Sequence, residues 1–381
     1  MQAETTFSLK DQLFNPAKVD YLATLISEVH TEFPKATFSH DVVSAFPELE
    51  LKERIAHIAA CLQTHLPSEY PVALDILLRS LPPELDPTKT DDDFGDFIFA
   101  PLSHFVAIYG CTPEHLDLSL NALRTITKRF SAEDAIRYFI NEFPVETMDV
   151  VNEWASDTNY HVRRLASEGT RPKLPWAQKL TIGYHEPLPI LDKLYTDPTR
   201  YVTRSVANHL NDISKLEPDL VINILDRWQK SKAQGEKEMA FILQHSLRTL
   251  VKQGDRAALK LLGFGGKPDI GITDFATSTS EVVIGNAFEF SLTIRSNKKQ
   301  KLVVDYLMEF ATEPGKKMKK RPQKIFKLKQ LDLEKGQVVN IKKKHPMKLM
   351  TTRRLFAGEH RISLQVNGEP FGKLSFELVE A

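Results

Sequence analysis

The chain has 381 residues, which is too long for one hydrophobic core and predicts two or three domains. Its hydrophobic content of 42% and charged content of 26% are typical of a soluble globular protein. No apolar run approaches the roughly 18 residues of a membrane span, and the N-terminus lacks the basic and apolar segments of a signal peptide. These features exclude an integral membrane protein, so we expect no membrane partner.

The cysteines and the charge distribution indicate the compartment and the kind of partner. Cys61 and Cys111 stand far apart, so they can form neither a disulfide framework nor a zinc site, and we expect a cytoplasmic protein. The formal net charge is zero, but residues from 268 onward carry 21 Lys and Arg against 13 Asp and Glu. A basic C-terminal part indicates a polyanionic partner or, alternatively, a surface that serves only solubility.

The first 150 residues read as helices. Apolar residues at helical spacing predict helices over 7–14, 19–29, 51–66, 72–81, 100–110 and 116–129, with Ser8 as an N-cap. Prolines, a glycine and the run Asp91–Asp93 predict a loop before residue 100. That run lacks the spacing of a calcium loop, so we interpret it as solvated. Ser131 is the expected N-cap of a further helix, which would place Glu133 in the first turn.

Residues 151–215 contain two copies of one pattern, forty residues apart. A weaker third copy lies near Phe241, where apolar positions persist and charged positions change. This period is typical of stacked helix pairs such as HEAT repeats. The first two copies also concentrate charge around Trp176. The matched pairs are Asp157 and Asp197, Val162 and Val202, Arg164 and Arg204, Ala166 and Val206, and Glu168 and Asn208.

The pattern changes after residue 262. Residues 263–268 read as a linker, and residues 269–381 show the period of two that is typical of strands. Six or seven strands without a helix predict an immunoglobulin-like antiparallel β-sandwich, with Asn367-Gly368 as a tight turn. We therefore expect an α-helical HEAT-like solenoid over 1–262, followed by the sandwich. The sandwich carries two basic clusters, one with Lys317, Lys319, Lys320 and Arg321 and the other with Lys342–Lys344. They could contact phosphates or protect edge strands from aggregation.

The charged residues of the two repeats indicate one kind of chemistry. The sequence shows no metal triad, Gly-rich phosphate loop or serine-nucleophile pattern, so we expect no metal and no cofactor. Carboxylates remain, close to arginines and an indole. Hydrolysis of a glycosidic bond uses carboxylates, because a negative charge stabilises an oxocarbenium-like transition state and a water needs a base. In a nucleic acid, the arginines would hold phosphates while the indole packs against sugar or base.

Three segments, SAEDAIRYF, HVRRLASEGTRPKLPWA and RYVTRSVANHLNDISK, resemble the signature segments of the AlkC family of bacterial DNA alkylation-repair glycosylases. The opening FSLKDQLFNPAKVDYLATLI is also similar, and the likeness covers residues 7–260. Residues 268–381 resemble the form of this family with an immunoglobulin-like C-terminal domain. The resemblance implies a base-excision repair enzyme that removes N3-methyladenine and N3-methylcytosine from duplex DNA without base flipping. We expect it to act as a monomer.

The resemblance also implies site residues. Glu168 and Asp212 would stabilise the sugar cation and activate water, Glu133 would be the third carboxylate, and Trp176 would pack against the deoxyribose. Four arginines would contact phosphates or orient the carboxylates, namely Arg163, Arg164, Arg171 and Arg204. Asp134, Tyr138 and Thr203 depart from the family pattern, which usually has an aromatic residue, a proline and an arginine there.

Each of these residues also has a purely structural interpretation. Arg164 and Arg204 could form inter-repeat ion pairs with Asp157 and Asp197. Trp176 could cap a hydrophobic layer, and Asp212 could be a helix N-cap. Glu168 precedes Gly169 near a helix end, where the helix dipole disfavours a carboxylate, so structure alone explains it less well. Two other functions stay open: a non-catalytic HEAT scaffold that binds DNA or protein, and a DNA binder that has lost its chemistry.

Overall fold

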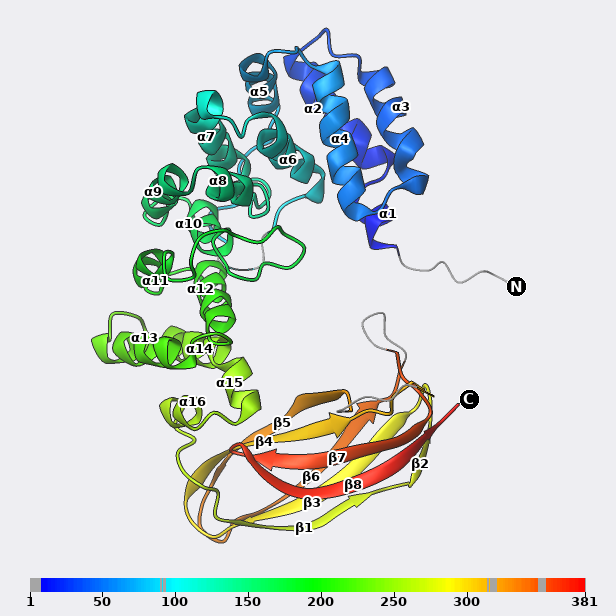
Figure 1. Cartoon of the computed structure of the whole chain (residues 1–381), viewed down its shortest axis with the longest axis vertical. Helices are drawn as coiled ribbons and strands as arrows, with labels where there is room; N and C mark the ends of the chain where they lie inside the picture. Colours follow the sequence, from blue (N-terminus) through cyan, green and yellow to red (C-terminus); the bar gives the residue numbers. More distant parts are fainter. Residues whose placement is uncertain are drawn as a thin grey trace. The chain divides into compact units, whose positions relative to one another are not determined.

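The computed structural model describes residues 8–89, 91, 94–313, 315, 321–348 and 354–380. The chain divides into two compact units (Figure 1). The helical unit contains residues up to 213 together with 228–245, and the second unit contains residues 214–227 and those from 246 onward. We describe each unit by itself. The domain boundaries expected at 262 and 269 stay a prediction.

Helices make up the first unit. They are α1 (Leu9–Leu13), α2 (Pro16–Val29), α3 (Lys35–Ala45), α4 (Leu51–His65), α5 (Tyr70–Arg79), α6 (Ala100–Tyr109), α7 (Leu116–Ile126), α8 (Ile136–Glu142), α9 (Pro144–Trp154), α10 (Tyr160–Glu168), α11 (Leu188–Leu194), α12 (Arg200–Ile213) and α14 (Glu236–Ser246). Helix α13 (Pro218–Ser231) joins the two units in sequence. Among the described residues, no helix has both the length and the hydropathy of a membrane span.

Local sequence explains where several of these helices begin. The side chain of Asn15 accepts a hydrogen bond from the backbone of Lys18 at 3.1 Å, and Pro16 occupies the first turn of α2. Glu50 and Glu53 form a reciprocal capping box at the start of α4. Ser8 occupies the predicted N-cap position of α1, but its side chain makes no capping hydrogen bond.

The two repeats fold as the stacked pairs α9–α10 and α11–α12 (Figure 1). Asp157 and Asp197 are equivalent in the structure as well as in the sequence. Each accepts a backbone hydrogen bond at 2.8 Å from the residue two positions later. Each also pairs with an arginine of the preceding repeat, Arg124 and Arg163 respectively. Arg164 pairs with Glu133 and Arg204 pairs with Asp91. The ion pairs expected with Asp157 and Asp197 are therefore wrong.

The contact between α10 and α12 forms the centre of this core. Val162 and Ala166 on α10, together with Val202 and Val206 on α12, are completely buried. These apolar positions recur at helical spacing, which is why the repeat was visible in the sequence. In the third copy the helix is interrupted at Leu247, between α14 and α15 (Arg248–Gln253).

The second unit contains α15, α16 (Arg256–Leu261) and a two-sheet sandwich. One sheet has the order β1-β3-β6 and the other β2-β8-β7-β4-β5. All pairs are antiparallel except β2 with β8. The strands are β1 (Ile270–Thr277), β2 (Glu281–Val283), β3 (Ala287–Ser296), β4 (Gln300–Glu309), β5 (Gln323–Leu333), β6 (Val338–Pro346), β7 (Gly358–Val366) and β8 (Glu369–Val379). The predicted fold class, helices followed by a β-sandwich, is confirmed.

The sequence missed strand β1. This strand is irregular, with a register shift between Thr273 and Ala276 and a positive φ of 54° at Asp274, so its residues do not alternate cleanly. The Asn367-Gly368 turn is confirmed, with φ values of 47° and 81° that suit the primed turns of β-hairpins. Gly368 also packs against Gly254, where an added Cβ would lie 2.6 Å from the Gly254 Cα.

Candidate active site

A pocket of about 370 Å³ lies on the helical unit between α10, α12 and the loop that follows α10. It brings together residues that are far apart in the sequence. Arg164 and Glu168 face it together because they are one helical turn apart on α10. The lining residues are Phe94, Glu133, Arg164, Glu168, Arg171, Leu174, Pro175, Trp176, Tyr201, Arg204, Ser205 and Asn208.

Glu168 is the most enclosed carboxylate of the pocket wall, with 5% of its surface exposed. One carboxylate oxygen accepts a hydrogen bond from Nη1 of Arg171, and the other accepts one from the Ser205 hydroxyl at 2.6 Å. Burial favours a higher pKa, but Arg164, Arg171 and the Ser205 hydrogen bond outweigh it and hold the pKa of Glu168 below its usual value. Glu168 is therefore an anion at neutral pH, although it is the last residue of α10.

Asp212 is buried and shares a partner with Glu168. Its Oδ2 accepts hydrogen bonds from Nε and Nη2 of Arg171, at 3.0 and 2.9 Å. Because α12 ends at Ile213, Asp212 lies in the last turn of a helix, and its interpretation as an N-cap is wrong. Asp212 does not line the pocket; it connects to the pocket through Arg171.

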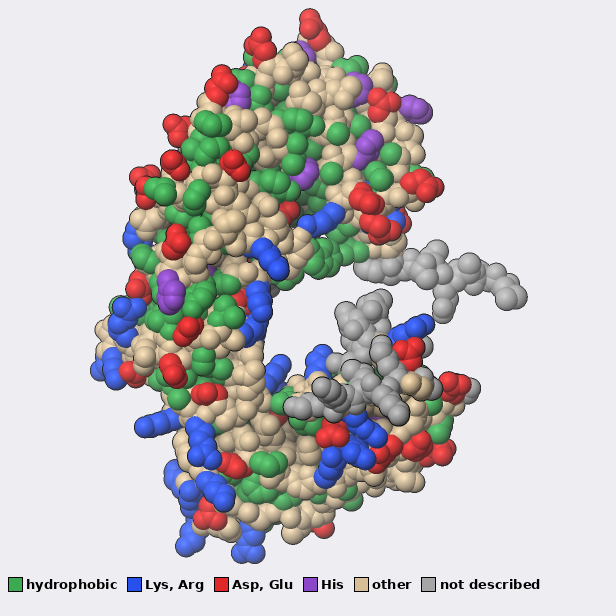
Figure 2. All heavy atoms as spheres, in the orientation of Figure 1, with side chains coloured by type: hydrophobic (Ala, Val, Ile, Leu, Met, Phe, Trp, Pro, Cys, Tyr) green, Lys and Arg blue, Asp and Glu red, His purple; other side chains and the backbone are tan. Residues whose placement is uncertain are grey.

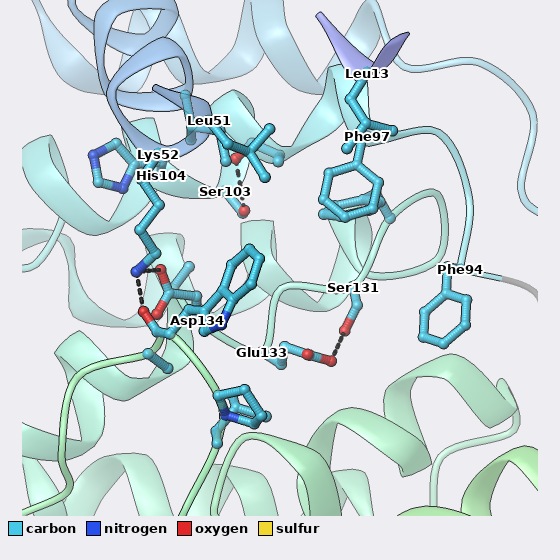
Figure 3. A pocket seen from close by; sticks show the side chains of 18 of the residues that line it. Leu13, Leu51, Lys52, Phe94, Phe97, Ser103, His104, Ser131, Glu133 and Asp134 are labelled. Atoms are coloured by element: carbon cyan, nitrogen blue, oxygen red, sulfur yellow. Dashed lines mark hydrogen bonds and ion pairs between the residues drawn. The ribbon is translucent and has the colours of Figure 1, made fainter. Parts of the chain in front are cut away.

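Glu133 is the third carboxylate, and it is more accessible, with 28% of its side chain exposed. It accepts hydrogen bonds from the Ser131 hydroxyl at 2.7 Å and from Nη1 of Arg164 at 2.6 Å. The Ser131 hydroxyl therefore donates to Glu133, and α8 begins only at Ile136, so the predicted Ser131 N-cap is wrong. Figure 3 shows Ser131 and Glu133 side by side.

Arg164 connects Glu133 to Glu168. Its guanidinium carbon lies 4.5 Å from the ring centre of Tyr201 and 5.6 Å from that of Phe94. Burial favours a lower pKa for Arg164, but the charges of Glu133 and Glu168 outweigh it and raise the pKa. Arg164 is thus a fixed cation that is stacked on an aromatic ring and ion-paired with the carboxylates.

Trp176 is 71% exposed and has a φ of 67°, a conformation that side-chain-bearing residues rarely adopt. Its exposure contradicts the interpretation that it caps a hydrophobic layer. Lys52 of α4 donates a hydrogen bond to its carbonyl oxygen. An exposed indole held in a strained turn is a feature of functional surfaces more than of packing.

Arg137 of α8 holds both ends of the loop that carries Trp176. It donates hydrogen bonds to the carbonyl oxygens of Gly169 at 3.1 Å, Arg171 at 2.8 Å and Gln178 at 2.7 Å. Only 1% of Arg137 is exposed, and burial lowers its pKa to about 10. The structure thus ties the position of Trp176 to a buried arginine that contacts backbone carbonyls.

The other predicted site residues lie outside this cluster or at its edge. Arg204 lines the pocket and pairs with Asp91 at 2.5 Å. Arg163 does not line the pocket and pairs with Asp197. Arg321 belongs to the second unit and donates to the backbone carbonyl of Glu359 at 2.7 Å. Lys317, Lys319 and Lys320 lie outside the described residues, as do Asp92 and Asp93 of the acidic loop.

Sequence reasoning missed Arg137, Ser205 and the ring of Tyr201. Ser205 had a visible signal, because it occupies the repeat position where the preceding copy has the core residue Leu165. A hydroxyl at an otherwise apolar position indicates a buried polar partner, and here that partner is Glu168. Within the described ranges, no group of three His, Cys, Asp or Glu side chains is arranged to hold a metal ion.

Two known proteins are similar to almost the whole of this chain. YhaZ of Bacillus subtilis (strain 168), described as an uncharacterised protein, is 32% identical over 371 residues, which cover 96% of this chain and 98% of the relative. The structure of Pseudomonas fluorescens alkylpurine DNA glycosylase AlkC, bound to DNA containing an abasic site analog, is 33% identical. It matches with a TM-score of 0.87 over 98% of this chain and 100% of that chain. This chain belongs to the AlkC family.

The sandwich also matches a known family model. Residues 271–380 match the model described as the C-terminal Ig-like domain of the uncharacterised protein YhaZ. The AlkC resemblance that the sequence segments carried is confirmed, and so is the immunoglobulin-like character of the second unit. The likeness to AlkC extends over both units, because it covers 98% of this chain.

Proposed function

We propose that this protein is a DNA glycosylase that hydrolyses the N-glycosidic bond of cationic N3-alkylated bases in duplex DNA, without base flipping. N3-methyladenine and N3-methylcytosine are the proposed substrates. One observation carries the proposal: Glu168 is held as an anion by two arginines and a serine beside the exposed Trp176. It is supported by the 33% identity to a glycosylase whose structure contains DNA with an abasic site analog.

The charge of the cluster suits a cationic substrate. Glu133, Glu168 and Asp212 pair with the two guanidinium groups of Arg164 and Arg171, so three carboxylates are fixed close to one another. An N3-alkylated base is already a cation and leaves without a strong general acid. The sugar then develops oxocarbenium character, which a fixed negative charge in a poorly solvated site stabilises.

The three carboxylates divide the work according to their exposure. Glu168 and Asp212 are buried and held by hydrogen bonds, so they supply a fixed electrostatic field. Glu133 is the partly exposed carboxylate and meets solvent, so it is placed to hold and deprotonate the attacking water. Trp176 offers its exposed ring to the deoxyribose. Arg204, at the edge of the pocket, is a candidate phosphate contact.

The experiment that tests the proposal measures release of methylated base from methylated duplex DNA. We expect wild type to release the base and Glu168→Gln to release it at least about 100-fold more slowly, the usual effect of losing one electrostatic contact to a transition state. Glu114→Gln, at an exposed position outside the pocket, is the matched control. DNA binding without any base release by wild type would contradict the proposal.

A further inference from the structure

A second pocket of about 480 Å³ adjoins the carboxylate cluster. It is lined by α1, α4, the turn at Phe97–Phe99, the start of α6 and the Trp176 loop, all within the helical unit. The two pockets share walls, so they lie next to each other. The shared residues are Phe94, Glu133, Leu174, Pro175 and Trp176.

The walls of this pocket are mainly apolar and aromatic. Phe94, Phe97, Phe130 and Trp176 supply rings, and Leu13 and Ile55 are among its aliphatic side chains. Figure 3 shows Phe94 and Phe97 on one side, His104, Lys52 and Asp134 on the other, and Glu133 at the edge. The polar groups are engaged with each other: Lys52 lies 3.9 Å from Asp134, and Glu133 is bonded to Ser131 and Arg164.

The reaction proposed above changes the charge of the base. The bond between C1′ and the base nitrogen breaks, and both electrons of that bond go to the base, which neutralises its positive charge. A water oxygen then bonds to C1′ and loses one proton to a carboxylate. The base therefore arrives as a cation and leaves as a neutral, planar, aromatic molecule.

We infer that the apolar pocket receives the excised base as a neutral nucleobase. This inference rests on the proposed function. Before cleavage, the carboxylates of Glu133 and Glu168 attract the cationic base. After cleavage that attraction is lost, and the aromatic walls next to Glu133 offer the neutral base a more favourable environment.

Size and polarity both fit this occupant. The pocket volume lies within the range of about 300–1,000 Å³ that is typical of small-ligand sites, which are usually apolar with a few polar groups. Burial lowers the pKa of His104, so its ring is neutral and adds no fixed charge to the wall. The exposed rings of Trp176 and Phe94 border both pockets.

The test is titration of the DNA-free protein with free N3-methyladenine and with adenine, followed by calorimetry and by tryptophan fluorescence. Trp154 and Trp228 are buried, so Trp176 reports on the pocket. Ile55→Phe on α4 and Leu13→Phe on α1 fill the pocket from two separate elements. Each should weaken binding of the free base about tenfold or more, the effect of overpacking a fitted site. Val72→Phe, on the exposed face of α5, is the matched control and should bind like wild type.

The outcomes separate the two proposals. Wild type that excises methylated base but binds no free base overturns the pocket inference alone, as does equal binding by both filled variants. Wild type that binds the free base but excises none overturns the proposed function and leaves a nucleobase site. Single-turnover excision by the Val72→Phe control should stay within about twofold of wild type, because Val72 lines neither pocket. In the filled variants, inhibition of base excision by added free base should weaken as much as the binding of free base does.

Discussion

Arg171 donates two hydrogen bonds to a single carboxylate oxygen of Asp212, through Nε at 3.0 Å and Nη2 at 2.9 Å. Its other terminal nitrogen donates to Glu168. One guanidinium therefore joins α12 to the end of α10 and neutralises much of the charge of two buried carboxylates. The planar fork of arginine allows this geometry, which the ammonium of lysine cannot reproduce.

Arg171→Met should lower the free energy of unfolding by about 3–5 kcal/mol, because it leaves buried carboxylates without their partner. Denaturant unfolding measures the change. Arg171→Lys keeps the positive charge but not the bridge, and we expect an intermediate loss. The contrasting variant is Arg79→Met, which removes an exposed arginine paired with Asp75 and should change stability by about 0.5 kcal/mol or less. A similar small loss for Arg171→Met would show that the bridge is not a structural element.

His209 predicts a pH dependence of stability. It is fully buried, and burial lowers its pKa from the ordinary 6.5 to about 4, while its Nδ1 lies 3.1 Å from the Ser167 carbonyl oxygen. The unfolded chain therefore binds a proton at this residue at pH values where the folded chain does not. Stability should fall as the pH is lowered from about 6.5 to 4, by at most about 1.4 kcal/mol per pH unit from this group.

The check is denaturant unfolding of wild type and His209→Gln at several pH values. The difference between the two proteins should change across the window from pH 6.5 to 4 and stay constant from pH 7 to 8. Acidification also destabilises the folded protein through Glu168, because its pKa is lower in the folded state than the ordinary value of 4.5. The stability that Glu168 contributes is fully present above pH 4.5 and is lost as the pH falls below that value. A constant difference from pH 8 down to 4 would contradict the role of His209.

Arg137→Met should release the loop that carries Trp176, because three backbone carbonyls lose their donor. We expect base excision to slow by about tenfold or more, since small misplacements of positioning groups have effects of this size. The Trp176 fluorescence should change in the absence of DNA, which a defect confined to catalysis would not produce. Arg137→Lys should restore part of the rate. Unchanged fluorescence and rate would show that other contacts hold the loop.

Trp176→Gly separates function from folding at this position. A residue with a side chain at a φ of 67° costs about 1–2 kcal/mol relative to the right-handed conformation, and glycine removes much of that cost. We expect thermal unfolding at or near the wild-type temperature together with a large loss of base excision. A clear drop in the unfolding temperature would instead show that the indole contributes to packing.

Much of the architecture follows from the sequence pattern. Buried residues such as Val162 and Val202 recur forty positions apart, and burial on one helix face must repeat wherever a helix pair repeats. The strands were visible through alternation, because one face of a sandwich strand is buried and the other is not. Strand β1 was not predicted, because its bulge near Asp274 breaks that alternation.

The residues of the site could be named from family segments, but their partners could not. Arg164 binds Glu133, from a turn 31 positions earlier, and not the aspartate of the neighbouring repeat. Such pairs depend on which helix faces meet in three dimensions, and local sequence does not encode the angle or separation of two helices. The contacts of Arg137 with three carbonyls could not be predicted either, because every residue has a backbone oxygen and its identity does not show which oxygen accepts a hydrogen bond. The apolar pocket beside Glu133 likewise arises from tertiary packing, where α1, α4, α6 and the Trp176 loop converge.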